Sequence, residues 1–224
     1  WPSRHVGGML HAQSPRMERK KRIALISTGG TIEKTYDELK GVLDNRASVL
    51  DVVLATLQLD GVDIIRIPLM NKDSLEMTPQ DHDLIARTAG SMAEAHDGVV
   101  IVHGTDRLAV TGERIVALLG TPRCPIVLTG AMRPYVMRNT DASQNLTEAL
   151  LAVQVLASGV YVAMHNKVLT FPGVVKDRDR GTFVRSAPVY EGQARAATFY
   201  GRARPGYHAV AVRTLDALLK WPPR

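Results

Sequence analysis

Residues 23–32 read IALISTGGTI, and residues 99–106 read VVIVHGTD. Each stretch begins with a run of apolar, mostly β-branched residues, which is typical of a strand buried on both faces of a parallel sheet. Each run stops near a glycine and then presents a threonine. Ligands bind at the carboxyl ends of the strands in open α/β sheets, so these two stretches predict a site that carries hydroxyl groups and a carboxylate.

The middle of the chain alternates between strand and helix patterns. Strands are expected at 22–27, 62–67, 98–102, 125–128 and 160–164, with the second ended by Pro68. Helices are expected at 47–59, 79–96, 108–119 and 141–157, with Thr78 and Asp141 as N-caps and Pro79 at a first helical position. This alternation implies right-handed βαβ crossovers. We therefore predict a three-layer α/β fold with a mainly parallel, Rossmann- or flavodoxin-like sheet.

The composition is that of an ordinary globular protein, with 45% hydrophobic and 22% charged residues in 224. No stretch approaches the roughly 20 apolar residues that cross a bilayer, and no secretory signal pattern is visible. Cys124 is the only cysteine, so an intrachain disulfide is excluded, and we interpret it as a small core residue. These features fit a cytoplasmic protein without a membrane partner.

The net charge of +6 comes from the two ends of the chain, since residues 1–22 and 185–224 are basic and the stretch between them is acidic. A basic arm can bind nucleic acid, but these ends carry no folded recognition motif. We therefore expect no nucleic-acid partner. The ends are interpreted as a basic, disordered N-terminal extension at 1–19 and a flexible or loosely docked basic tail at 191–224.

Five motifs occur together in one order: TGGTI at 28–32, Asp73-Ser74, HGTD at 103–106, TGAMRP at 129–134, and Lys176. In that combination the chain resembles the bacterial-type L-asparaginases over about residues 20–190. The resemblance implies a catalytic α/β domain of the N-terminal type at 20–190. It is greatest to short-chain members of the family, so we expect the family's second, smaller domain to be absent.

The resemblance also implies a set of catalytic residues. Thr31 corresponds to the nucleophile, and Tyr36 lies on a loop at 33–44 that would close over it as a lid. Thr105, Asp106 and Lys176 correspond to a relay in which the lysine accepts a proton.

The substrate-binding residues follow from the same resemblance. Ser74, with Asp73 beside it, would hold the α-carboxylate of the substrate, and Asp106 would bind its α-ammonium group. Gly30 and Gly104 would let the substrate approach the backbone closely.

Each motif also has an interpretation without catalysis. The glycine-rich turn suits helix capping or a phosphate cradle, although neither a P-loop nor a G-x-G-x-x-G pattern is present. Thr105 and Asp106 suit an N-cap for the helix at 108–119. Asp73-Ser74 suits a plain turn, and residues 176–180 suit a solvated charge run. His103 is expected to be a buried core histidine. His82 falls where family members often have an aromatic residue, a difference expected to affect packing only.

The sequence thus predicts an L-asparaginase that hydrolyses L-asparagine to L-aspartate and ammonia through an acyl-enzyme. The alternatives are a glutaminase-asparaginase or related amidase, and a non-catalytic module that binds an amino acid or a polyanion. No cluster with metal-ligand spacing is visible, so neither a metal nor an organic cofactor is expected. We expect a homo-oligomer and weaker substrate binding than in the longer relatives.

Overall fold

The structure, a computed structural model, describes residues 19–37, 41–44 and 49–186. The expected N-terminal extension, apart from Arg19, and the expected C-terminal tail lie outside the described residues.

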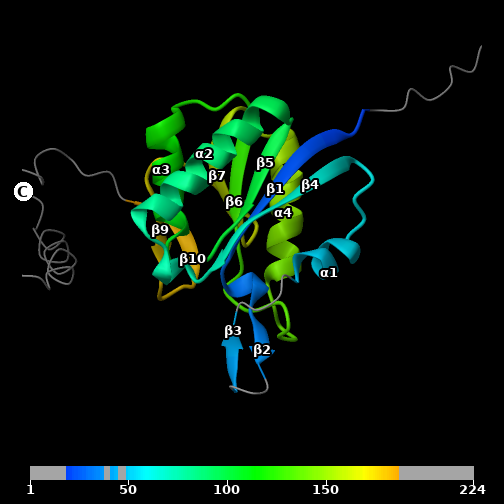
Figure 1. The fold of residues 1–224 in the computed structure, drawn as a ribbon, viewed down its shortest axis with the longest axis vertical. Helices are drawn as coiled ribbons and strands as arrows, with labels where there is room; N and C mark the ends of the chain where they lie inside the picture. Colours follow the sequence, from blue (N-terminus) through cyan, green and yellow to red (C-terminus); the bar gives the residue numbers. More distant parts are fainter. Residues whose placement is uncertain (1–18, 38–40, 45–48, 187–224) are drawn as a thin grey trace, which may run out of the picture. The chain divides into compact units, whose positions relative to one another are not determined.

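A six-stranded sheet forms the centre of the described chain (Figure 1). Its strands, in spatial order, are β4 (Val62–Lys72), β1 (Lys21–Gly29), β5 (Gly98–Val102), β6 (Pro125–Thr129), β7 (Gly159–Met164) and β8 (Lys167–Thr170). The first five are parallel, and β8 pairs with β7 in the antiparallel direction. The predicted α/β fold with a mainly parallel sheet is confirmed.

The order of the parallel strands places a topological switch point beside β1. Counted along the chain, the five parallel strands follow the flavodoxin-like order 2-1-3-4-5. After β1 the chain moves to one side to form β4 and then returns to the other side to form β5. The connections therefore leave β1 and β5 in opposite directions, and the carboxyl ends of these strands are the place where an open α/β sheet carries its ligand crevice.

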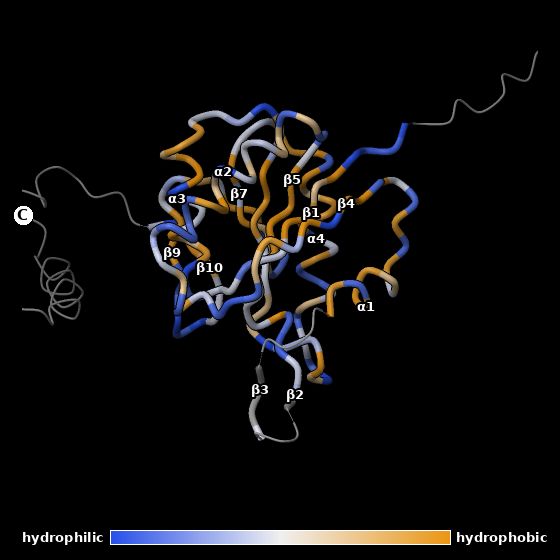
Figure 2. The backbone as a smooth tube through the Cα atoms, viewed as in Figure 1, coloured by the Kyte–Doolittle hydropathy of each residue, from blue (hydrophilic) through white to orange (hydrophobic). Residues whose placement is uncertain are grey.

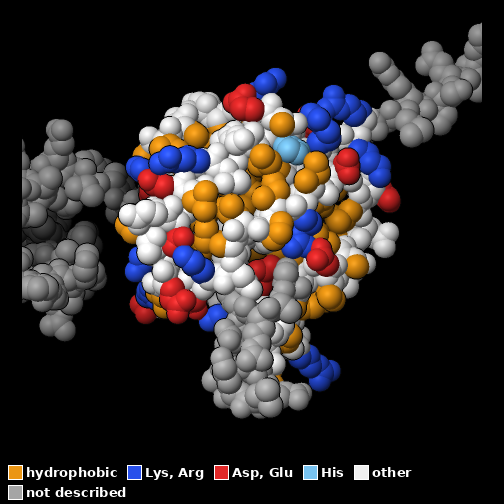
Figure 3. Space-filling view, viewed as in Figure 1, with side chains coloured by type: hydrophobic (Ala, Val, Ile, Leu, Met, Phe, Trp, Pro, Cys, Tyr) orange, Lys and Arg blue, Asp and Glu red, His pale blue; other side chains and the backbone are white. Residues whose placement is uncertain are grey.

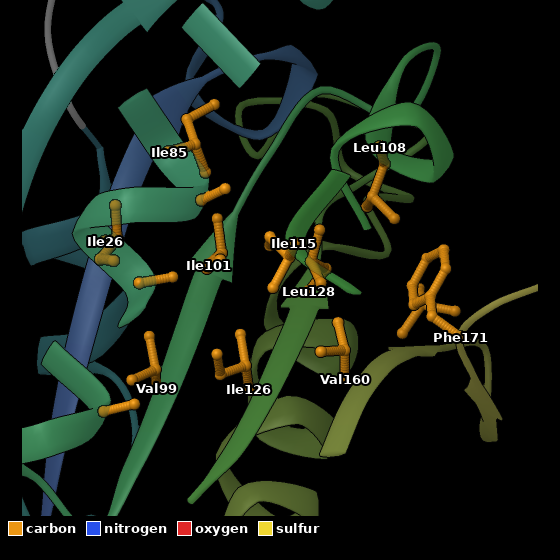
Figure 4. Packing of buried hydrophobic residues seen from close by; sticks show 14 of the residues in the cluster. Ile26, Ile85, Val99, Ile101, Leu108, Ile115, Ile126, Leu128, Val160 and Phe171 are labelled. Atoms are coloured by element: carbon orange, nitrogen blue, oxygen red, sulfur yellow. The ribbon is translucent and has the colours of Figure 1, made fainter. Parts of the chain in front are cut away.

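Helices cover both faces of the sheet because the strand side chains alternate between two apolar layers. On β1, Ala24 and Ile26 pack into the layer under α2 (Pro79–Ala95) and α3 (Leu108–Leu119), which Figure 4 shows. Ile23 and Leu25 pack into the opposite layer, under α1 (Leu50–Ala55) and α4 (Ala142–Val155). Figure 2 shows the central strands as the most hydrophobic part of the chain.

Most predicted elements are confirmed to within one or two residues, but two differ in length. The strand predicted to end before Pro68 continues through it to Lys72. A proline is tolerated there because β4 is an edge strand and has a partner on one side only. The helix predicted at 47–59 is limited to Leu50–Ala55 within the described residues.

Three short elements follow Met164 that the sequence analysis did not predict: β8, β9 (Val174–Asp177) and β10 (Thr182–Arg185). His165 and Asn166 join β7 to β8 with φ values of 54° and 57°, the conformation of a tight hairpin turn. β9 and β10 form a separate antiparallel hairpin. The loop expected at 33–44 contains a small hairpin of β2 (Thr35–Asp37) and β3 (Val42–Asp44), which extends from the body of the molecule (Figure 1).

Two details complete the packing. Cys124 is buried, and burial raises the pKa of its thiol to about 11, which fits the predicted core role.

Hydrophobic side chains also gather on the face seen in Figure 3, and Leu84 of α2 and Ile65 of β4 are about half exposed. The helices therefore cover the centre of the sheet more completely than its β4 edge.

A glycine in α3 gives a test of this packing. A Cβ at Gly112 would overlap the ring of the buried Phe171. Gly112→Ala in a free helix would add about 1 kcal/mol of stability, but overpacking costs about 1–3 kcal/mol. Because the overlap is with ring atoms of Phe171, the upper end of this cost applies, and we expect a net loss of about 2 kcal/mol in urea denaturation. Gly61→Ala is the control, because its Cβ would lie 3.6 Å from the Gln154 side chain, and it should be nearly neutral.

Candidate active site

The turns after β1, β4 and β5 are in direct backbone contact at the switch point. Gly30 has a φ of 86°, and a Cβ there would lie 2.5 Å from the Gly104 nitrogen. A Cβ at Gly104 would lie 2.6 Å from Ser74 Oγ. The Gly30 N–H donates to the Lys72 carbonyl at 3.0 Å. Only glycine fits at positions 30 and 104. Because glycine has no side chain, the three turns can approach one another this closely.

Thr31 is the first residue of η1 (Thr31–Glu33), one turn of 3-10 helix that directly follows this contact. Ile32 beside it is fully buried and anchors the turn, whereas Thr31 itself is half-buried. The Thr31 carbonyl accepts the Lys34 N–H at 3.2 Å. The predicted nucleophile therefore lies directly after the switch point, with its side chain partly accessible to solvent.

Asp73 and Ser74 start the next turn, η2 (Ser74–Glu76). Asp73 accepts the Leu75 N–H at 3.0 Å and pairs with the Lys34 ammonium group at 2.7 Å. The hydrogen bond from Lys34, and then that from Leu75, hold the pKa of Asp73 below its ordinary value. Ser74 is buried against Gly104. The turn interpretation is correct for Asp73, but this turn also links η1 to the β5 end.

Thr105, Asp106 and Lys176 meet although about 70 residues separate them in sequence. Lys176 Nζ lies 2.8 Å from Thr105 Oγ1 and 3.1 Å from Asp106 Oδ1. The Thr105 side chain is buried, and the Lys176 side chain is only 15% exposed. The predicted assembly of these three residues is thus present in the structure.

The alternatives for these residues do not hold. The N-cap of α3 is Arg107, and no side chain caps the helix, so the interpretation of Thr105 and Asp106 as caps is wrong. The low exposure of Lys176 also excludes a solvated charge run at that position.

Arg178 is a further residue of the site that the sequence analysis missed. It donates to Asp106 Oδ1 at 2.9 Å, on the same oxygen that Lys176 contacts. It lies in the turn between β9 and β10. The alternating charges of residues 176–180 were the feature that could have indicated Arg178. That pattern does not say which of the charged side chains contact the site.

Tyr36 lies on β2 and is 61% exposed. Within the described part of the chain, no hydrogen bond joins it to Thr31 or to any other site residue. Its predicted role in activating the nucleophile stays a prediction.

A buried chain of hydrogen bonds supports the Gly104 turn from behind. His103 Nδ1 lies 2.8 Å from the Gly104 carbonyl, and His103 Nε2 lies 2.7 Å from Thr111 Oγ1. Thr111 Oγ1 in turn lies 2.7 Å from His82 Nδ1. The rings of His82 and His103 stack with centroids 6.2 Å apart.

Proton counting fixes the direction of this chain. Burial lowers the pKa of His103 to about 4, so its ring is neutral at pH 7. The carbonyl can only accept, so His103 Nδ1 carries the proton and Nε2 accepts from the Thr111 hydroxyl. That hydroxyl then accepts from His82 Nδ1. His103 is a buried histidine as predicted, but His82 does more than fill space, so the packing-only expectation is wrong.

Asp141 holds the turn after β6 in a second buried network. Its carboxylate accepts the N–H groups of Met132 and Arg133, both at 3.0 Å, and contacts His165 Nε2 at 2.8 Å. Asn145 donates to Asp141 at 2.8 Å and to the Gly130 carbonyl at 2.9 Å. Asp141 stands at the predicted N-cap position of α4, but its side chain does not cap that helix. It serves the preceding turn instead.

This second network reaches the site through Gly130. A Cβ at Gly130 would overlap the His103 carbonyl and lie 3.4 Å from Thr105 Cγ2. The β6 turn therefore packs directly against the residues that carry Thr105. The four-residue spacing of Asp141 and Asn145 on one helix was the signal that could have predicted this network.

The described residues contain no group of three or more metal-ligating side chains that could hold an ion. They also contain no helix of sufficient length and apolar character to cross a bilayer.

The family model described as "Asparaginase, N-terminal" matches residues 22–183. The chain belongs to the asparaginase family. This match reaches every strand of the central sheet and all the motifs assembled at the crevice.

The relatives of this asparaginase-family chain include proteins with two different names. An "L-asparaginase" of Thermococcus kodakarensis is 32% identical over 71% of this chain and 49% of its own length. A component of the glutamyl-tRNA(Gln) amidotransferase of Methanobrevibacter smithii is 33% identical over 66% of this chain and 34% of its own length. The chain thus spans half or less of these relatives.

Solved structures of the family share the fold. The thermostable L-asparaginase from T. kodakarensis is 32% identical with a TM-score of 0.67, covering 73% of this chain and 51% of that one. A probable cytoplasmic L-asparaginase from Campylobacter jejuni is 34% identical with a TM-score of 0.60, covering 70% and 48%.

Replacing Thr111 tests the buried histidine chain. Thr111→Val keeps the shape but leaves His103 Nε2 and His82 Nδ1 without their shared partner. We expect a loss of about 2–4 kcal/mol in urea denaturation, since each unpaired buried group costs about 1–3 kcal/mol. Thr111→Ser keeps the hydroxyl and should lose about 1 kcal/mol for its missing methyl group. Equal losses in the two variants would show that the hydroxyl contributes nothing.

Asp141→Asn tests the second network, because an amide nitrogen would face N–H groups that need an acceptor. Burial raises the pKa of Asp141, but hydrogen bonds from Met132, His165 and Arg133 outweigh burial and leave it below the ordinary 3.8. The carboxylate therefore stabilises the fold fully above the unfolded-state pKa, and this contribution is lost as the pH falls through the folded-state value.

We expect Asp141→Asn to cost about 2–4 kcal/mol at pH 7 in urea denaturation. The difference from wild type should shrink as the pH falls below about 4. Asp63→Asn, at an exposed position on β4, is the matched control and should be nearly neutral. A penalty that stays constant from pH 7 to pH 3 would contradict this account.

Proposed function

We propose that this chain is an amidohydrolase of the L-asparaginase type, which hydrolyses L-asparagine to L-aspartate and ammonia. The observation that carries this proposal is the contact of Lys176 Nζ with Thr105 Oγ1 at 2.8 Å, beside Asp106 and on the same crevice as Thr31. A buried lysine that donates to a hydroxyl and is paired with a carboxylate suits proton transfer. A module that only binds an amino acid or polyanion has no use for it.

In the proposed first step, Thr31 Oγ1 attacks the side-chain amide carbon of the substrate. The C–N bond breaks, the hydroxyl proton of Thr31 ends on the leaving nitrogen, and ammonia departs from an acyl-threonine ester. Backbone N–H groups at the Gly30 and Gly104 turns would stabilise the oxyanion that forms on the amide oxygen. Tyr36 is proposed to approach Thr31 when substrate is bound.

In the second step, a water molecule attacks the ester carbon. Thr105 Oγ1 takes a proton from this water and passes its own to Lys176, which Asp106 holds in place. The ester bond breaks, the proton returns to Thr31, and aspartate leaves. Ser74 is proposed to bind the α-carboxylate with the Gly30 and Gly104 backbone, while Asp73, paired with Lys34, holds this substrate-binding turn in place. No step requires a metal or an organic cofactor.

A second candidate is supported by the relatives that are named as components of amidotransferases. The same hydrolysis, with glutamine or asparagine as donor, would then release ammonia for transfer within a larger assembly. One methylene separates the two amides, and a simple pocket discriminates that difference by only about 1–3 kcal/mol. The amide preferred by this chain therefore needs measurement.

Two further properties belong to the proposal. A homo-oligomer is proposed because the chain belongs to the asparaginase family. A cytoplasmic location is proposed from the single cysteine and from the "probable cytoplasmic" description of the C. jejuni relative.

The experiment is ammonia release from L-asparagine and L-glutamine by wild type, Thr31→Ala and Lys176→Met. We expect Thr31→Ala to lose activity by at least about 1000-fold and Lys176→Met by about 100- to 10,000-fold. Thr170→Ala and Lys21→Met, at exposed positions on β8 and at the start of β1, are matched controls that should keep full activity.

Ammonia release by wild type that persists undiminished in Thr31→Ala would overturn the assignment of Thr31 as the nucleophile. A folded wild type that releases ammonia from neither amide would favour the binding module.

A further inference from the structure

The carboxylates of the crevice already have cationic partners within this chain. Asp106 Oδ1 contacts both Lys176 and Arg178, at 3.1 and 2.9 Å. Asp73 pairs with Lys34 at 2.7 Å. Each of these carboxylates is therefore already paired with a basic side chain of this chain, and Asp106 contacts two of them.

Arg178 is the partner of Asp106 that has no part in the proposed proton transfer. It lies in the turn after β9, where the neighbouring Asp177 is bound by Arg180, which donates its N–H at 3.1 Å and approaches with its guanidinium at 3.7 Å. Asp177 is therefore occupied within its own turn. Arg178 instead reaches a carboxylate that is 72 residues earlier in the chain.

This arrangement conflicts with the binding of a free α-ammonium group. An amino-acid amide is a zwitterion, and its ammonium group needs a carboxylate that is not already paired with a guanidinium group. At Asp106 it would meet the guanidinium of Arg178 as a like charge at short range. An acid amide without the ammonium group carries only a carboxylate, for which Arg178 offers a planar, two-pronged donor.

We propose that Arg178 is a specificity-determining residue that shifts the preference of this site from free amino-acid amides towards amides of dicarboxylic acids without a free α-ammonium group. Succinamate is the simplest member of that class. This inference rests on the proposed amide hydrolysis and adds the substrate class to it. The hydrolysis itself is the same, with succinamate and water giving succinate and ammonia.

The expected effect is modest because the Arg178 side chain is 68% exposed. Exposed ion pairs are weak and screened by salt, so each substrate should change by about two- to fivefold. The informative quantity is the ratio of kcat/KM for succinamate to kcat/KM for L-asparagine, measured with the full 224-residue chain. Differences in folding or enzyme concentration cancel in this ratio.

We expect Arg178→Gln to lower this ratio at least about threefold and Arg178→Lys to keep most of it. Arg180→Gln is the matched control, since it removes the same charge from the same turn at a residue that contacts Asp177 rather than Asp106. In the wild type, about 1 M salt should lower the ratio in the same direction as Arg178→Gln. A ratio that is unchanged in Arg178→Gln, or equally changed in Arg180→Gln, overturns the inference.

Binding of the products separates this inference from the proposed function. Calorimetric titration with succinate and L-aspartate gives the same comparison without turnover. If neither amide releases ammonia but Arg178→Gln weakens succinate relative to aspartate, the proposed hydrolysis fails and the assignment of Arg178 stands. If ammonia is released and neither ratio responds to Arg178→Gln, the hydrolysis stands and the assignment of Arg178 fails.

Discussion

The close approach of two glycines at the switch point is the constraint on which the site depends. Gly30 and Gly104 follow neighbouring strands, and their backbones are so near that a Cβ at Gly30 would overlap Gly104. Ser74 fills the space on the other side of Gly104. Because the contact is between backbones, the threonines that follow each glycine have little freedom to move apart. The positions of both threonines therefore depend on two residues that have no side chain.

Two buried polar networks keep this contact in place from below. The chain from His82 through Thr111 to His103 ends on the carbonyl of Gly104. The Asp141 network holds the β6 turn, whose Gly130 lies against the same strand end. Buried polar groups are stabilising only when their partners are present, so each network fixes one local arrangement. In each network, residues outside the five motifs (His82 and Thr111 in one, Asp141 and Asn145 in the other) are joined to motif residues. Both networks serve the backbone rather than the substrate.

The charges beside Thr105 contrast with the uncharged histidine chain behind it. Lys176 is largely buried and tied to Thr105 and Asp106, whereas Arg178 contacts the same carboxylate from a solvent-exposed turn. A buried pair of this kind sets the geometry of a reaction, while an exposed charge adjusts which ligand is preferred. Two residues on one short hairpin therefore have separate consequences for the proposed function.

The sequence by itself determined the central strands, the two main helices on one face and the residues at the strand ends. Runs of β-branched residues and the Thr78–Pro79 helix start are local signals with strong physical causes. It did not determine where β4 ends, because the tolerance of Pro68 depends on that strand being at the sheet edge.

It also did not reveal the partners of Asp141, nor that Lys176 and Arg178, within an alternating charge run, both contact Asp106. Those outcomes depend on contacts between segments that lie up to 72 residues apart, and a local pattern contains no information about them. Only the tertiary structure, by closing the β9–β10 hairpin over the β5 end, decided which charged residues meet the site.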